Sequence, residues 1–104
     1  MNYDQQDADK EILSTLRQHG DNMFKVRPVL HYSLFDDKKS LQVFLDKLKS
    51  LSIQAIPTKK PLGARITMSS DMVEKNIFSQ IKTVFELVVS SGGKYDGWET
   101  EIAN

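Results

Sequence analysis

The stretch "DDKKSLQVFLDKLKSLSIQAIPTKKPLGARITMS", residues 36–69, contains three consecutive elements and determines the fold class. Its first half, residues 36–52, has apolar residues three and four apart, which is the stripe of an amphipathic helix. Asp36 or Asp37 can cap the free amides at its start. The second half predicts two short strands, residues 53–57 and 64–69, with a turn supplied by Pro61 and Gly63. The helix stripe consists of Leu41, Phe44, Leu45, Leu48 and Leu51.

The segments on either side add a strand before this unit and a helix and a strand after it. Residues 24–35 are rich in branched and aromatic side chains and predict a strand, in which Pro28 marks the start or a bulge. Residues 71–91 predict a helix, and residues 95–102 predict the last strand. The order is βαββαβ, which is the ferredoxin-like arrangement: an α+β two-layer sandwich with an antiparallel sheet. Right-handed crossovers would put both of these helices on one face of the sheet. The stripe of the helix at 71–91 is Ile77, Ile81, Val84, Phe85 and Val88.

An extra N-terminal helix is expected over about residues 5–19. Ala8, Ile12, Leu13 and Leu16 form its apolar stripe, and Gly20 can take the left-handed conformation that ends a helix. The length of 104 residues predicts a single domain, residues 1–104.

Composition excludes several classes of site and suggests a compartment. The chain has no cysteine, so disulfides, thiolate nucleophiles and cysteine metal sites are ruled out. The N-terminal "MNYDQQDADKEI" is too polar and acidic for a signal peptide, and no apolar run approaches the roughly 20 residues of a membrane helix. A cytoplasmic protein without membrane association is therefore expected.

Charge is balanced over the whole chain but not along it. The net charge is zero, whereas residues 25–65 contain nine basic and three acidic residues, a net charge of +6. Two interpretations stay open: a solvated surface in which both signs mix after folding, and a basic patch that steers an acidic partner.

The sequence offers few groups for catalysis. His19 and His31 are the only histidines, and their spacing does not fit a metal site. No G-x-S-x-G motif supports a nucleophilic serine. The glycine-rich "GGKYDG", residues 92–97, precedes a strand, whereas a phosphate cradle leads into a helix. We expect no catalytic residues, no metal and no cofactor.

The aromatic residues argue against direct RNA binding. RNA-recognition modules of this topology place two or three aromatics on the open sheet face within a K/R-G-F-type motif, and that motif is absent. The aromatics expected in strands are Phe24, Tyr32, Phe35, Tyr95 and Trp98.

The segment "YDGWE", residues 95–99, combines a structural and a binding hypothesis. Strand alternation puts Trp98, Thr100 and Ile102 on one face and Gly97, Glu99 and Glu101 on the other. Trp98 is expected to pack under the helices, with Gly97 permitting a close approach or a bulge. The candidate partner-binding residues are Tyr95, Asp96 and Glu99.

Three motifs resemble the regulator of ribonuclease activity B family, over about residues 8–102. They are "YDGWE"; "L-x-x-L-x-x-x-GD", formed by Leu13, Leu16, Gly20 and Asp21; and "R-x-V-x-H" with a following phenylalanine, formed by Arg27, Val29, His31 and Phe35. We interpret Gly20, Asp21, Arg27, His31, Gly97 and Trp98 as structural motif residues. The resemblance implies a ferredoxin-like fold and a non-enzymatic role, in which the protein binds ribonuclease E and alters RNA degradation.

The leading functional hypothesis is therefore a protein-binding regulator similar to the ribonuclease E inhibitors. The alternative is a ligand-sensing module, or a homodimerising one, of the same topology. The third hypothesis is an RNA-binding sheet.

Overall fold

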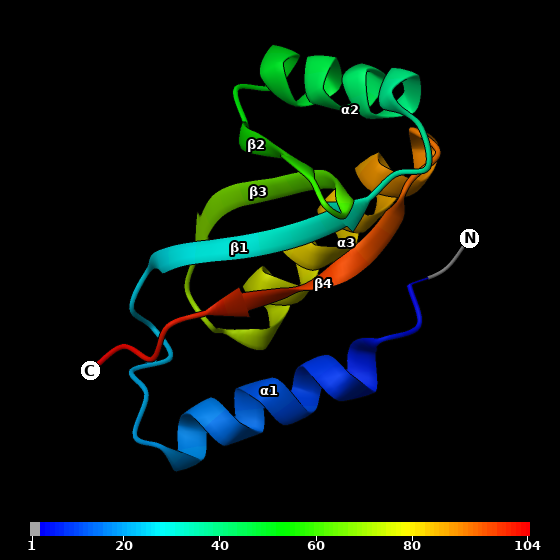
Figure 1. The fold of residues 1–104 in the computed structure, drawn as a ribbon. Helices are drawn as coiled ribbons and strands as arrows, with labels where there is room; N and C mark the ends of the chain where they lie inside the picture. Colours follow the sequence, from blue (N-terminus) through cyan, green and yellow to red (C-terminus); the bar gives the residue numbers. More distant parts are fainter. Residues whose placement is uncertain (1–2) are drawn as a thin grey trace.

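The computed structural model describes residues 3–104 (Figure 1). Within them, three helices accompany one four-stranded antiparallel sheet in the order β2-β3-β1-β4, so the predicted α+β class is confirmed. The elements are α1 (Gln6–Gln18), β1 (Arg27–Leu34), α2 (Lys38–Ser50), β2 (Gln54–Lys59), β3 (Leu62–Ser70), α3 (Glu74–Ser90) and β4 (Lys94–Thr100).

Both later helices pack on the same face of the sheet, as predicted. One buried cluster joins side chains of α2 and α3 to β3, and a second joins α1 and α3 to β1 and β4. In Figure 1, α1 runs alongside β4, which is one edge of the sheet. The opposite sheet face carries none of the described helices and is the open face of the molecule. The first cluster includes Leu41, Phe44, Leu48, Ala64, Ile66, Val84 and Val88, and the second Leu13, Val29, Met72, Ile77, Ile81 and Trp98.

The start of α2 resolves the choice between the two aspartates. The Asp37 carboxylate accepts a hydrogen bond of 2.7 Å from the Ser40 amide, and this bond lowers the pKa of Asp37. Leu41, Phe44 and Leu48 are buried as expected. Leu51 is an exception, because the helix has ended before it and its side chain is 54% exposed.

The predicted stripe of α1 was wrong in two positions. Ala8 and Ile12 are exposed, and the helix instead buries Asp9 and Leu13. The reason is a hydrogen bond from Trp98 that holds Asp9 on the inner side, described below. Because Asp9 is buried and Ala8 is not, the buried face of α1 is rotated relative to the predicted stripe.

Strand and helix boundaries differ from the prediction mainly at the ends. Phe24 and Val26 precede β1 and are 80% and 63% exposed. Helix α3 begins at Glu74 rather than Asp71, and β4 ends at Thr100, so the exposed Ile102 lies outside the strand.

The β2–β3 hairpin is tighter than predicted. The strands extend to Lys59 and Leu62, so Gly63 belongs to β3 and not to the turn. A Cβ at Gly63 would lie 1.9 Å from the Ser33 carbonyl oxygen. This glycine therefore permits close approach of β3 to β1.

Candidate partner-binding site

A buried ion pair ties the segment around the start of β1 to the segment after β4 at one end of the sheet. The Arg27 guanidinium donates to both carboxylate oxygens of Asp21 at 2.6 and 2.8 Å, and their side chains are 6% and 0% exposed. Arg27 also donates to the carbonyl of Glu101, and the Ala103 amide donates to Asp21 at 2.9 Å. The hydrogen bonds from Arg27 are the main reason that the pKa of Asp21 is lowered. The Asp21–Arg27 clamp thus fixes the segment after β4 against the start of β1.

His31 lies at the centre of the helix-covered face and is fully buried. The Gln80 amide nitrogen donates to the Ser69 carbonyl, so its oxygen is left to accept from His31 Nε2 at 2.9 Å. Nδ1 then accepts from the Tyr95 hydroxyl at 2.8 Å. Both ring nitrogens are occupied, and burial lowers the pKa of His31.

Asp9 connects α1 to the last strand. Its carboxylate is 3% exposed and accepts from Trp98 Nε1 at 2.8 Å and from the Tyr3 hydroxyl at 2.6 Å. Trp98 itself is 8% exposed and packs in the second core cluster. The Tyr3 ring makes edge contacts with Phe85 and Tyr95, at centroid distances of 5.1 and 5.9 Å.

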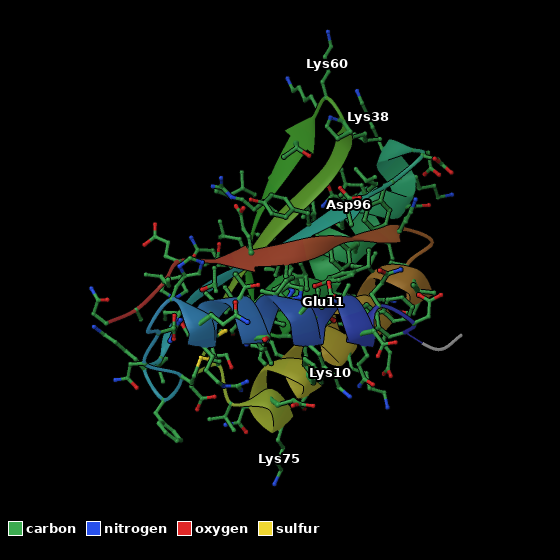
Figure 2. All side chains as sticks on the ribbon, turned by 90° about the horizontal axis from the view of Figure 1, so that it is seen from below. Lys10, Glu11, Lys38, Lys60, Lys75 and Asp96 are labelled. Atoms are coloured by element: carbon green, nitrogen blue, oxygen red, sulfur yellow. The ribbon has the colours of Figure 1, made fainter. Side chains whose placement is uncertain are left out.

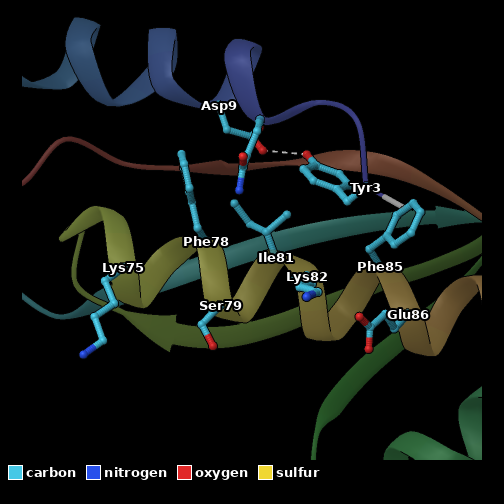
Figure 3. A pocket seen from close by; sticks show the side chains of 10 residues that line it. Tyr3, Asp9, Lys75, Phe78, Ser79, Ile81, Lys82, Phe85 and Glu86 are labelled. Atoms are coloured by element: carbon cyan, nitrogen blue, oxygen red, sulfur yellow. Dashed lines mark hydrogen bonds between the residues drawn. The ribbon is translucent and has the colours of Figure 1, made fainter. Parts of the chain in front are cut away.

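A pocket of about 560 Å³ lies beside Asp9, between α1 and α3 (Figure 3). Tyr3 and Asp9 form one side, and Phe78 and Ile81 of α3 form the other. Both Asp9 oxygens already accept hydrogen bonds from the protein itself. We assign no ligand to the pocket.

A bulge in β4 separates the three candidate binding residues. Ser33 pairs with Tyr95 and His31 with Trp98, so two residues of β4, Asp96 and Gly97, oppose the single residue between them in β1. Gly97 has φ of +104°, which suits glycine. The extra residue turns Tyr95 to the helix-covered face together with Trp98.

Asp96 and Glu99 remain exposed, whereas the Tyr95 hydroxyl is used internally. Glu99 accepts a hydrogen bond of 2.5 Å from the Tyr32 hydroxyl on the open face, and this bond raises the pKa of Tyr32. Of the aromatics expected in strands, Tyr32 is the one that β1 presents there. Trp98 and Phe35 are buried, at 8% and 6% exposure.

The open face next to Tyr32 carries a guanidinium and an apolar side chain. Arg65 pairs with Tyr32 on one side and with Ile56 on the other. Its Nε is buried and has no hydrogen-bond partner within residues 3–104. Ile56 is 45% exposed. This mixture of aromatic, cationic and apolar groups is typical of protein interfaces.

The lysines of the middle segment lie mainly on α2 and the β2–β3 hairpin. Figure 2 shows Lys38 and Lys60 at the end formed by α2 and the β2–β3 hairpin, whereas Asp96 lies on β4. Six of the nine basic residues between positions 25 and 65 therefore belong to α2 and the hairpin, whereas Lys25, Arg27 and Arg65 lie elsewhere. The six lysines of α2 and the hairpin are Lys38, Lys39, Lys47, Lys49, Lys59 and Lys60.

Residues 3–104 contain neither a metal-binding cluster nor a membrane-spanning helix. No cluster of three or more histidine, aspartate or glutamate side chains there is arranged to hold a metal ion. None of the helices between residues 3 and 104 has the length and apolarity needed to cross a membrane.

A protein-family model described as regulator of ribonuclease activity B matches residues 6–100. The chain belongs to this family. The match begins at the first residue of α1 and ends at the last residue of β4, so it includes every helix and strand of the described structure. It confirms the resemblance inferred from the three motifs. Comparison with individually curated proteins gave no match.

The family motifs contribute directly to the buried networks of this regulator of ribonuclease activity B family member. Asp21 and Arg27 form the clamp, while His31, Tyr95 and Trp98 belong to the internal hydrogen bonds. Sequence reasoning missed four residues that hydrogen-bond to the motif residues, either directly or through Asp9: Asp9, Gln80, Tyr32 and Tyr3. Asp9 had a signal, because it lies four residues before Leu13 on an apolar stripe. Gln80 and Tyr32 had none, because they lie 49 and 67 positions from His31 and Glu99. Tyr3 had none because it bonds to Asp9 and not to a motif residue.

Proposed function

We propose that this protein is a non-enzymatic regulator of RNA degradation in the cytoplasm, which acts by binding ribonuclease E. The observation that carries the proposal is the family match over residues 6–100. We further propose that the fold is ferredoxin-like, which the element order βαββαβ after α1 and the strand order β2-β3-β1-β4 support.

The arrangement of polar side chains supports binding rather than catalysis. His31, Asp21 and Arg27 are buried in hydrogen bonds to the protein itself, so their chemistry serves the architecture. Asp96 and Glu99 are exposed on β4, where another protein can reach them. We propose them as contact residues, together with Tyr32. Tyr95 would act indirectly, because its hydroxyl holds His31.

Binding to purified ribonuclease E tests the function. We expect the wild-type protein to bind the scaffold region of the enzyme in calorimetry and to change its cleavage rate on a structured RNA. Asp96→Ala combined with Glu99→Ala should weaken binding by about tenfold, because charges at an interface rim mainly assist association. Glu86→Ala, an exposed acid on α3, is the matched control. Absence of both binding and any change in cleavage would refute the function.

One observation favours the alternative, a dimerising module. The open face carries the half-buried Leu30, Tyr32 and Leu34 and the exposed Ile56, with none of the described helices over them. A sheet-to-sheet dimer would cover these side chains. Sedimentation at increasing protein concentration distinguishes the two hypotheses, and Ile56→Lys should abolish a dimer of this kind.

A further inference from the structure

A groove lies on the molecular surface at the end of the sheet where β1 begins and β4 ends. Its volume is about 760 Å³. Val26 and Ile102 contribute exposed apolar walls, at 63% and 47% exposure. Pro28 and Leu30 add to it from the strand face opposite the buried Val29. Exposed apolar side chains that gather in one patch, rather than lying scattered, mark an interaction surface. We call these four residues, with Glu99 and Glu101, the sheet-end groove.

The charged groups of the groove are mainly acidic. Glu99 and Glu101 are both exposed and line it. Arg27 also contributes to the lining, but its guanidinium is bound to Asp21 and is 94% buried with the rest of the side chain, so it neutralises neither glutamate. Lys25 is the one basic side chain of the lining without such a bond. The groove thus combines apolar walls with an excess of negative charge.

The walls of the groove are held in place before any partner arrives. The Asp21–Arg27 clamp binds the carbonyl of Glu101 and the amide of Ala103, on either side of Ile102. The backbone carbonyl of Asn22 accepts a hydrogen bond from Arg27, and its backbone N–H donates one to the Ala103 carbonyl at 2.7 Å. A surface that is already ordered loses little conformational entropy on binding.

We propose that the sheet-end groove binds a short segment of a partner protein in which apolar side chains alternate with arginine or lysine. The apolar side chains would cover Val26, Leu30 and Ile102, and the cations would meet Glu99 and Glu101. This rests on the proposed function only for the partner's identity, which would be ribonuclease E. The chemistry of the segment follows from the groove itself.

Charge makes the other occupants poorer fits. In a two-fold dimer the same surface meets itself, so Glu99 and Glu101 would face their own copies. Nucleic acid would bring phosphates against these glutamates, whereas RNA-binding surfaces are predominantly basic. A peptide with both apolar and cationic side chains complements the apolar walls and the two glutamates.

The test uses the full chain and two synthetic peptides, one alternating leucine with arginine and one alternating leucine with glutamate. Val26→Lys combined with Ile102→Lys removes apolar area and adds repulsive charge. Val43→Lys, at an exposed valine of α2 with 46% exposure, is the matched control. Melting temperatures of all variants verify that folding is intact, which we expect because the altered side chains are exposed.

We expect the leucine–arginine peptide to bind the wild-type protein at least about tenfold more tightly than the leucine–glutamate peptide. The double variant should lose at least about tenfold in affinity for it, the control less than about twofold, and Glu101→Gln should reduce the salt dependence. Equal binding of the two peptides, or unchanged affinity of the double variant, would overturn the proposal. The proposal would also be overturned if the wild-type protein formed a dimer or bound RNA and the double variant did not.

Binding to ribonuclease E separates this inference from the proposed function. If the enzyme binds the wild-type protein and the double variant equally, the groove proposal fails and the function stands. If the enzyme does not bind the wild-type protein, the function fails, and the peptide results alone decide on the groove.

Discussion

The buried polar side chains Asp9 and His31 each have a hydrogen-bond partner from a distant part of the chain. Asp9 meets Trp98 across 89 positions, and His31 meets Gln80 across 49. Burying such groups is costly unless they are hydrogen-bonded, so each pair favours one arrangement of the elements over its alternatives. At the scale of single residues, the motif positions therefore determine how the layers fit together.

His31 should make stability depend on pH in a defined window. Because burial lowers its folded-state pKa below the ordinary value of 6.5, the unfolded chain takes up the proton first as the pH falls. The free energy of unfolding should thus be greatest above pH 6.5 and decrease below it, by at most about 1.4 kcal/mol per pH unit. Urea denaturation at several pH values measures this slope.

Replacing each histidine in turn tests whether His31 causes that slope, with His19 as the control. His31→Gln should flatten it below about pH 6.5, whereas His19→Gln, at an exposed position, should leave it unchanged. An equal slope in the His31 variant and the wild-type protein would contradict the assignment.

The Trp98–Asp9 hydrogen bond should be measurable as a coupling energy. Trp98→Phe keeps most of the apolar volume but leaves the buried carboxylate with one donor fewer, at a cost of about 1–3 kcal/mol. Combined with Asp9→Asn, the two changes should be non-additive by about 0.5–3 kcal/mol. Chemical denaturation of the four proteins gives the cycle. Strict additivity would mean that the tryptophan contributes by packing alone.

At the scale of elements, the bulge in β4 decides which side chains face the core. Regular alternation would put Tyr95 and Trp98 on opposite faces, because they are three residues apart. The extra residue brings both to the helix side, where Tyr95 reaches His31 and Trp98 reaches Asp9. Asp96 is left exposed at the bulge itself, next to the open edge of the sheet.

Gly97 should be the residue that makes this bulge possible. Its φ of +104° is strained for any residue with a side chain, although a Cβ there would meet nothing within 4 Å. Gly97→Ala should therefore lower the free energy of unfolding by about 1–3 kcal/mol through backbone strain rather than a clash. Urea denaturation measures the loss. Lys94→Ala, at the exposed start of β4, is the control, and an equal, small effect of both changes would show that the bulge tolerates other residues.

At the scale of the whole molecule, the two core clusters share one face of the sheet, and α3 contributes to both. β1 and β3 are the inner strands, paired on both sides, while α1 joins the core mainly through Asp9 and Leu13. Cooperativity should therefore be strongest where α3 covers the inner strands, and α1 should be the least protected helix.

Amide hydrogen exchange can measure this gradient. Protection should be highest in β1 and β3, high in α3 and α2, and lower by about tenfold or more in α1, because few of its side chains are buried. Native-state exchange followed by NMR gives these values residue by residue. Protection of α1 equal to that of β1 would indicate that the N-terminal helix belongs to the same cooperative unit as the sheet.

The order of elements could be predicted from sequence because it depends on local patterns. The stripe of Leu41, Phe44 and Leu48 and the cap at Asp37 are properties of neighbouring residues, and they are present in the structure as expected. Ile77, Ile81, Val84 and Val88 of the predicted α3 stripe are buried as well, while Phe85 is half-buried. Periodicity carries this information because a helix and a strand each repeat over a few residues.

The inward turn of Tyr95, the burial of Asp9 and the sheet-end groove were decided only by the tertiary structure. Each depends on groups far apart in the chain: a bulge set by pairing with β1, an acid held by Trp98, and a C-terminal segment held by Arg27. Short-range patterns do not contain such pairings. They arise because buried donors and acceptors must find partners once the layers have packed, and those partners are wherever the fold has brought them.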